Sequence, residues 1–140
     1  MNKRIFIDTN VMLDFLGERN PFYTSIAKIA TLAENGTLEM VTSPISFATV
    51  NYFISKFENS KIARNKLRKF KILTEICNLN EQTLEKALNS SFSDFEDALQ
   101  YFSAAESNCD IIITRNGKDF KKSLLPVMTP DEFLKSLTLS

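Results

Sequence analysis

The sequence contains no histidine and no tryptophan, and its 140 residues include only two cysteines. Without histidine, Ser-His-Asp and Cys-His catalysis, an imidazole general base and histidine-containing zinc sites are all excluded. The two cysteines, Cys77 and Cys109, form no CxxC pair, so neither a disulfide framework nor a thiolate metal site is indicated. We predict that both are buried apolar residues. Any catalysis must therefore use carboxylates, hydroxyls, amides or lysines.

Long hydrophobic runs are also missing. The apolar stretch near the N-terminus spans only residues 5–7, which is too short for a signal-peptide core, and no run approaches the ~18 apolar residues of a membrane span. We therefore predict a cytoplasmic protein with no membrane partner. With 44% hydrophobic residues, the chain suits one globular domain over residues 1–140.

The chain has no excess of positive or negative charge, but its basic and acidic residues lie in different segments. The 17 basic residues balance the 17 acidic ones, so no net basic field is available to hold a polyanion. Residues 56–71 nevertheless contain seven basic residues and one acid, whereas residues 72–110 contain eight acids and one lysine. Any contact with nucleic acid must therefore come from a local patch.

The basic segment has two interpretations. It is either the solvated face of a helix, with Ile62, Leu67 and Phe70 turned inward, or a surface that contacts the backbone phosphates of a nucleic acid. The second interpretation uses Lys61, Arg64 and Arg68 as substrate-binding residues.

Short hydrophobic strands alternate with helices along the whole chain. The predicted strands are 4–7, 39–42, 72–77, 110–114 and 127–128. The predicted helices are 11–16, 25–35, 44–57, 81–90 and 94–108, one from about 60 and one from 130. Asn20-Pro21 resembles a helix start, and Gly36 supplies a helix stop. This alternation favours an α/β fold, with a parallel sheet wrapped by helices through right-handed crossovers.

Polar side chains gather in three segments where function is expected in such a sheet. Residues 8–10 follow the first strand, residues 114–119 follow the most apolar strand, and residues 93–97 begin a helix. The carboxyl ends of parallel strands open into a common crevice. Hard divalent cations such as Mg²⁺ prefer the oxygen ligands that these segments offer. A metal site is therefore a natural catalytic design for a chain without histidine.

Each segment also has a purely local explanation. One of residues 8–10 would cap the following helix, and Asp119 would brace a turn. Ser93 and Glu96 match a capping box, in which the acids of the first turn favour the positive end of the helix dipole. Independent caps would have no reason to coincide at one edge of the sheet, and this joint placement favours a shared function.

Three motifs resemble the signature regions of PIN-domain ribonucleases. They are Ile7-Asp8-Thr9-Asn10-Val11, Asp94-Phe95-Glu96-Asp97-Ala98, and Ile113-Thr114-Arg115-Asn116 through Asp119-Phe120. The resemblance implies a PIN-like three-layer sandwich with a short central parallel sheet, and an acidic pocket that binds Mg²⁺ or Mn²⁺ and cleaves RNA. Many single-domain members are VapC-type toxins of bacterial toxin-antitoxin pairs. An antitoxin protein as partner and a homodimer as assembly are both left open.

The resemblance also assigns roles to individual residues. Asp8 and Asp97 match the metal-binding carboxylates, and three further residues complete the catalytic set: Asp94, Asn116 and Asp119. Besides the basic segment, the expected substrate-binding residues are Thr9, Asn10, Asn51, Thr114 and Arg115. The expected chemistry is attack of a metal-activated water on the RNA phosphodiester.

The sequence departs from the family pattern at two positions. The helix after the second strand usually carries a glutamate, but residues 43–56 contain no acid, and the matching position is Asn51 or Thr49. The fourth acidic position is Asn116. Each amide keeps an oxygen ligand but removes about one unit of negative charge, which weakens ion capture and relieves repulsion among the acids.

Three alternatives follow from these observations. The first is a catalytically weakened PIN domain that binds RNA or a protein. The second is a phosphoryl-transfer domain of receiver or phosphatase type, although Asp8 lacks a second acid two positions later. The third is an interaction domain in which the acids act only as helix caps.

Overall fold

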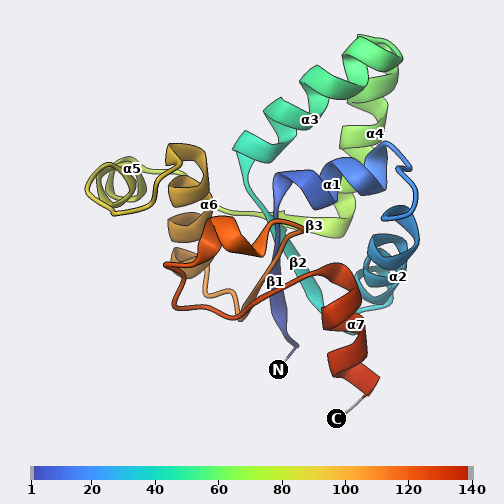
Figure 1. Cartoon of the computed structure of the whole chain (residues 1–140). Helices are drawn as coiled ribbons and strands as arrows, with labels where there is room; N and C mark the ends of the chain where they lie inside the picture. Colours follow the sequence, from blue (N-terminus) through green and yellow to red (C-terminus); the bar gives the residue numbers. More distant parts are fainter. Residues whose placement is uncertain (1, 139–140) are drawn as a thin grey trace.

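A computed structural model describes residues 2–138 of the chain (Figure 1). The strands are β1 (Arg4–Ile7), β2 (Glu39–Thr42), β3 (Thr74–Ile76), β4 (Ile111–Ile113) and β5 (Val127–Met128). The helices are α1 (Thr9–Leu16), α2 (Tyr23–Glu34), α3 (Pro44–Phe57), α4 (Ser60–Leu73), α5 (Glu81–Leu88), α6 (Phe95–Glu106) and α7 (Pro130–Thr138), with one turn of 3-10 helix, η1 (Gly117–Phe120).

The five strands form one parallel sheet in the order β3-β2-β1-β4-β5. β1 lies at its centre, where Phe6 pairs with Val41 of β2 and Ile112 of β4. This arrangement confirms the predicted α/β class and parallel sheet. Because the strands are parallel, their carboxyl ends meet at one edge of the sheet. The polar segments that follow β1 and β4 therefore emerge side by side.

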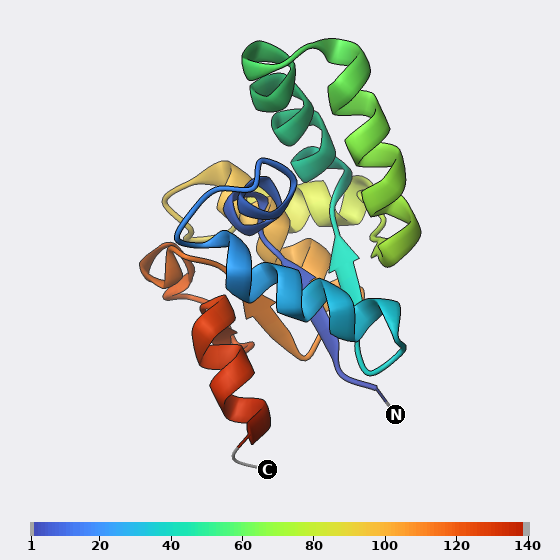
Figure 2. The same ribbon diagram turned by 90° about the vertical axis from the view of Figure 1, so that its right-hand side faces the viewer.

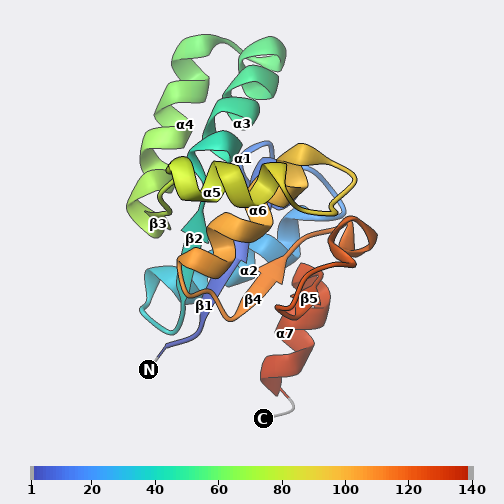
Figure 3. The same ribbon diagram turned by 90° about the vertical axis from the view of Figure 1, so that its left-hand side faces the viewer.

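Alternation along the strands gives the sheet two buried faces, which makes the fold a three-layer sandwich. Ile5 and Ile7 pack with α1, α2, α4 and α7, whereas Phe6 faces a second core containing Tyr101 of α6 and Phe120 of η1. Figure 2 shows α2 and α7 in front of the first face, and Figure 3 shows α5 and α6 in front of the opposite face. Every strand side chain of β1 from Ile5 to Ile7 is fully buried.

α3 and α4 form an antiparallel pair that rises above the carboxyl edge of the sheet (Figures 1 and 2). On α4, Phe70 is buried and Leu67 is partly buried, as predicted, but the prediction for Ile62 is wrong because it is 38% exposed. The small side chain of Ala63 takes the buried position instead, where α4 approaches the core. The basic residues of α4 therefore lie mainly on its solvent face.

The helix boundaries differ slightly from those predicted. The strand expected at 72–77 is shortened because α4 continues to Leu73. α2 begins at Tyr23, not at Pro21, because the preceding residues form a turn in which the Tyr23 N–H donates to the Arg19 carbonyl. The stop at Gly36 is confirmed: its φ is +84°, a conformation that glycine adopts without strain.

Two smaller predictions also have an outcome. Cys77 and Cys109 are buried and unpaired with each other, as predicted. Within the described residues, none of the helices has the length and apolar character needed to cross a lipid bilayer.

Candidate active site at the carboxyl edge of the sheet

Asp8 lies at the end of the central strand and is only 7% exposed. Its Oδ2 accepts hydrogen bonds from Thr114 Oγ1 at 2.8 Å and Asn10 Nδ2 at 3.4 Å, and its Oδ1 accepts one from Gln100 Nε2 at 3.3 Å. Although Asp8 occupies the N-cap position of α1, its side chain makes no capping hydrogen bond. The capping explanation therefore fails for Asp8, whose carboxylate points into a polar network instead.

Gln100 and Ser46 complete this network, and sequence reasoning missed both. The Gln100 amide also donates to Thr9 Oγ1 at 3.3 Å and Ser46 Oγ at 2.9 Å, and the two hydroxyls lie 2.8 Å apart. Gln100 Oε1 is buried and has no hydrogen-bond partner. A signal for Gln100 was available, because it lies one helical turn after Asp97 and so shares its face of α6.

Four more carboxylates interact electrostatically with Asp8 or with one another. They belong to Asp94, Glu96, Asp97 and Asp119. Burial raises the pKa of Asp97 to about 7. The negative charges that add to this shift are those of Asp94, Asp8, Asp119 and Glu96. The carboxylates of α6 and η1 therefore form one acidic cluster with Asp8.

Burial likewise raises the pKa of Asp8 and of Glu96. Hydrogen bonds from Thr114 and Gln100 favour the ionised form of Asp8 but do not reverse the shift. Glu96 was not among the predicted site residues, although its position beside Asp97 in the acidic first turn of α6 was a signal.

Asp94 has a capping role as well. It is the N-cap of α6, and its Oδ1 accepts a hydrogen bond from the Asp97 backbone N–H at 2.9 Å. The predicted capping box of Ser93 and Glu96 is therefore wrong: α6 begins at Phe95, which moves the N-cap from Ser93 to Asp94.

No cationic side chain neutralises the acidic cluster. Within residues 2–138, none of the ion pairs includes Asp8, Asp97 or the other three carboxylates of the cluster. A divalent cation would relieve their repulsion, and carboxylate and amide oxygens suit a hard cation. In the same part of the chain, no three Asp, Glu or Cys side chains already converge as a complete metal-binding group. A cation bound among these oxygens would need water or a substrate phosphate to complete its shell, as Mg²⁺ usually keeps.

Thr114 and Asn10 tie the third polar segment to this site. Asn10 Nδ2 donates to Thr114 Oγ1 at 3.3 Å, and its Oδ1 accepts from the Arg115 backbone N–H at 3.3 Å. The backbone N–H of Asn116 donates to Thr114 Oγ1 at 3.1 Å. The side chains of Asn116 and Asp119 are exposed at the solvent edge of the site, which we call the rim.

Arg115 is held by a second buried carboxylate, Asp14 of α1, which sequence reasoning also missed. Arg115 Nε lies 2.6 Å from Asp14 Oδ2, and Arg19 Nε lies 3.1 Å from Asp14 Oδ1. The guanidinium carbon of Arg115 is also 4.0 Å from the centre of the Phe22 ring. A single acid inside the apolar run 11–16 was the signal that a buried ion pair forms here.

The remaining predicted substrate residues lie on the α3–α4 pair. The Asn51 side chain accepts a hydrogen bond from Ser55 Oγ of the same helix at 3.5 Å, and the α3 residue within the Asp8 network is Ser46. Lys61, Arg64 and Arg68 border an open hollow on α4. The structure thus brings together Asp8, Thr9, Asn10, Thr114 and the acidic cluster, and it leaves the basic α4 residues on a separate surface.

Comparison with known sequences identifies one family. The PIN domain family model matches residues 4–118. The chain is 30% identical over 138 residues to Ribonuclease VapC1 of Aquifex aeolicus (strain VF5), an alignment that covers 94% of each chain.

Solved structures share the fold. A chain of the DNA-bound VapBC complex of Salmonella typhimurium matches with a TM-score of 0.68 at 14% identity, covering 93% of this chain and 99% of that one. A chain of a toxin-antitoxin complex from Klebsiella pneumoniae matches with a TM-score of 0.66 at 22% identity, covering 90% and 97%. These likenesses confirm the predicted fold.

Proposed function

Because the chain belongs to the PIN-domain family, we propose that it is a divalent-metal-dependent ribonuclease that hydrolyses RNA phosphodiester bonds. We also propose that it acts in the cytoplasm as the toxin of a type II toxin-antitoxin pair. One observation supports the catalytic part: five carboxylates interact at the carboxyl edge of the sheet, and within residues 2–138 none of them forms an ion pair with a basic side chain.

The proposed cofactor is Mg²⁺ or Mn²⁺. Asp8 and Asp97 would hold it, with assistance from Asp94, Asn116 and Asp119 directly or through water. When bound, such a cation lowers the pKa of a coordinated water and stabilises negative charge on the phosphoryl oxygens.

Side chains around Asp8 have an orienting role. Thr114, Gln100 and Asn10 donate to its two oxygens and fix the carboxylate toward the rim. Partners of this kind commonly change metal affinity or activity by about 10–100-fold when they are removed. Asp97, with a pKa of about 7, is partly protonated at neutral pH in the metal-free protein. Loading of the site would therefore release a proton and become tighter as the pH rises.

RNA would lie across the rim and reach toward α4. Thr9, Asn10, Asn51, Thr114 and Arg115 are the proposed contacts near the carboxylates. Arg115 uses Nε and Nη2 for Asp14, so its other N–H groups can donate to a phosphate. The exposed Lys61, Arg64 and Arg68 would add phosphate contacts, which predicts that binding weakens steeply with salt.

The toxin role rests on the relatives. The 30% identical relative is a ribonuclease, and similar folds occur in structures described as toxin-antitoxin complexes. The proposed protein partner is accordingly an antitoxin, and a second copy of this chain is the proposed assembly partner.

The test is cleavage of a mixed single-stranded RNA pool by the purified protein. We expect turnover with Mn²⁺ or Mg²⁺, none with EDTA, and a loss of more than about 100-fold in the Asp8→Asn and Asp97→Asn variants, because direct ligands should matter more than their hydrogen-bond partners. Asp110→Asn, distant at the start of β4, is the matched preparation control for contaminating nuclease. Equal cleavage by all the proteins would reject the assignment.

A second function is favoured by two specific residues. Amides stand at Asn51 and Asn116 where the family pattern has acids, which makes a catalytically weakened PIN domain that binds RNA or protein the alternative. Metal-dependent turnover in the same assay would eliminate it.

A further inference from the structure

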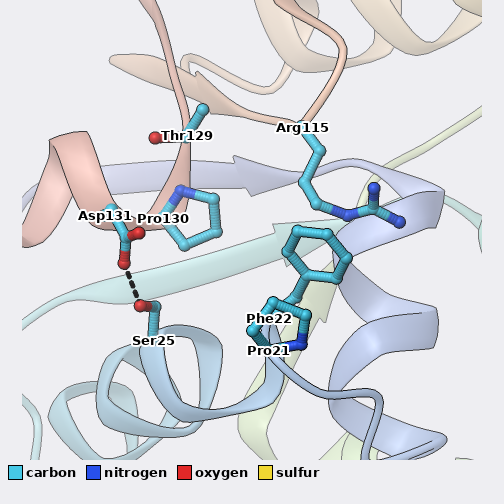
Figure 4. Close-up of a pocket in the computed structure, with 7 residues that line it drawn as sticks. All are labelled: Pro21, Phe22, Ser25, Arg115, Thr129, Pro130 and Asp131. Carbon is cyan, nitrogen blue, oxygen red and sulfur yellow. Dashed lines mark hydrogen bonds between the residues drawn. The ribbon is translucent and has the colours of Figure 1, made fainter.

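A pocket of about 270 Å³ lies between the start of α2 and the start of α7, beside Arg115 (Figure 4). Pro21, Phe22 and Ser25 line it from α2 and the turn before it, and Thr129, Pro130 and Asp131 line it from α7 and the residue before it. The orienting network around Asp8 uses none of these residues.

Arg115 connects this pocket to the acidic cluster. Its backbone N–H donates to Asn10, and the preceding residue, Thr114, donates to Asp8. Its side chain packs against the Phe22 ring, as Figure 4 shows, and its guanidinium carbon lies 4.0 Å from the centre of that ring. Thr114 at the Asp8 network and Arg115 at the pocket are therefore consecutive residues of the segment that follows β4.

Part of the pocket lining is made of apolar rings. Phe22 is 39% exposed although its ring is large, and the pyrrolidine rings of Pro21 and Pro130 line the same space. A ring that stays exposed in a concave site is suited to stacking against a nucleobase, because every base has a π-face. The pocket volume of about 270 Å³ is large enough for one base.

The polar part of the pocket lining combines donors, Arg115 and the Thr129 hydroxyl, with one carboxylate acceptor, Asp131. Ser25 Oγ donates its proton to the Asp131 carboxylate, and an ionised carboxylate can only accept. Among the four RNA bases, guanine alone offers two adjacent N–H donors, N1–H and the exocyclic N2 amino group. Adenine and cytosine place an acceptor nitrogen next to their amino group, and uracil has one N–H flanked by carbonyls. The Asp131 carboxylate therefore favours guanine.

We propose that this pocket binds the base of a guanine nucleotide next to the phosphodiester that is cut, with Phe22 as the stacking surface and Asp131 as the specificity-determining acceptor. This inference rests on the proposed ribonuclease function and adds the sequence preference of that same site. Arg115 contacts the phosphate that joins the guanine to the scissile position.

In the test, the parent protein cleaves a random-sequence pool of single-stranded RNA in the presence of Mn²⁺. Sequencing of the products then gives the bases on either side of each cleavage site. Guanine is expected to be enriched at least about tenfold at one fixed position, as for a two-hydrogen-bond base contact. Replacing that guanine by inosine, which lacks the N2 amino group, should remove most of the preference. Asp131→Asn, which keeps the side-chain shape, and Phe22→Ala should each reduce the enrichment to below about twofold.

Matched controls are Glu34→Gln, an exposed acid at the far end of α2, and Phe57→Ala, a phenylalanine 82% exposed on α3. Both should keep the guanine preference. RNA cleavage without base preference, or a preference that survives both pocket substitutions, would overturn the inference and leave the ribonuclease proposal standing.

If the parent cleaves no RNA, the proposed function fails and the pocket is tested separately by titrating GMP and AMP into the metal-free protein. Tighter binding of GMP that is lost in Asp131→Asn supports the guanine pocket, and equal or absent binding rejects it. Selective binding of free GMP together with unselective RNA cleavage would also reject the assignment to the RNA strand.

Discussion

Two buried aspartates six residues apart, Asp8 and Asp14, have opposite electrostatic surroundings. Asp14 is 1% exposed and forms ion pairs with Arg115 and Arg19. Asp8 is 7% exposed and receives hydrogen bonds only from neutral groups, while other carboxylates lie near it. Burying an uncompensated charge is costly, and most proteins avoid it.

Under the proposed function, the difference separates a structural carboxylate, Asp14, from a metal-binding one, Asp8. The protein supplies the counter-charge of Asp14 from its own sequence, and that ion pair fixes the segment carrying Arg115. Within residues 2–138, no ion pair supplies a counter-charge to Asp8, and we propose that a bound cation does so. An acidic site that is fully satisfied within the chain would have no affinity left for a cation.

The largest effect that tests this contrast is on stability. Asp14→Asn leaves two arginines without their shared partner and should lower the free energy of unfolding by about 2–3 kcal/mol, less than for a fully buried pair because the arginines are 23% and 44% exposed. Asp8→Asn should leave the metal-free stability unchanged or raise it by up to about 1 kcal/mol, because it removes an uncompensated charge.

Urea unfolding of both variants in EDTA measures these values, with Glu34→Gln as the exposed control. In Asp8→Asn, rotation of the Gln100 amide would let its unpartnered Oε1 accept from the new side chain. A larger loss in Asp8→Asn than in Asp14→Asn would contradict the contrast.

A smaller effect is expected at the hydrogen bonds that replace a counter-charge at Asp8. Gln100→Leu removes the donor to Asp8, Thr9 and Ser46 and should weaken metal binding by about tenfold. Titration of Mn²⁺ by calorimetry gives the dissociation constant. Gln82→Leu, at an exposed position of α5, makes the same chemical change away from the site and should leave that constant unaltered.

The smallest effect is the pH dependence of the metal-free protein. The pKa of Asp97 is raised to about 7, and those of Asp8 and Glu96 are also raised, so the folded state binds more protons than the unfolded state between about pH 4 and 7. The free energy of unfolding contributed by these groups therefore falls as the pH rises through this window.

Thermal unfolding in EDTA should accordingly give a melting temperature a few degrees higher at pH 5.5 than at pH 8, relative to Asp97→Asn. Millimolar Mn²⁺ should raise the melting temperature most at pH 8, since a ligand selective for the native state stabilises it. An Asp97→Asn protein with the same pH profile as the parent would show that Asp97 is not coupled to the cluster.

The fold was largely predictable because its helices and strands are short and local residues mark where they begin and end. The strands at 4–7 and 39–42 and the helix at 44–57 match the structure, since hydrophobic spacing, Pro44 and Gly36 set their limits locally. The convergence of the segments after β1 and β4 followed from the parallel sheet alone. The proposed roles of individual side chains at that edge remain predictions.

The partners of the site were less accessible to sequence reasoning. Gln100 and Ser46 are joined across 54 residues, and Asp14 and Arg115 across 101, and helical spacing does not specify such pairs. The N-cap of α6 was misplaced by one residue for a similar reason, because Ser93 and Asp94 are both good caps and the packing of α6 selects between them.

The backbone of Asp8 also has a consequence for how the site opens. Its N–H donates to the Ile113 carbonyl at 3.0 Å, which extends the central β1–β4 ladder by one rung into the site. That amide should exchange with solvent deuterium only when the whole sheet comes apart, whereas the exposed turn bearing Asp119 can exchange through local opening. The part of the site built on Asp8 should therefore open only when the domain unfolds, whereas the turn bearing Asp119 can change conformation in the folded protein.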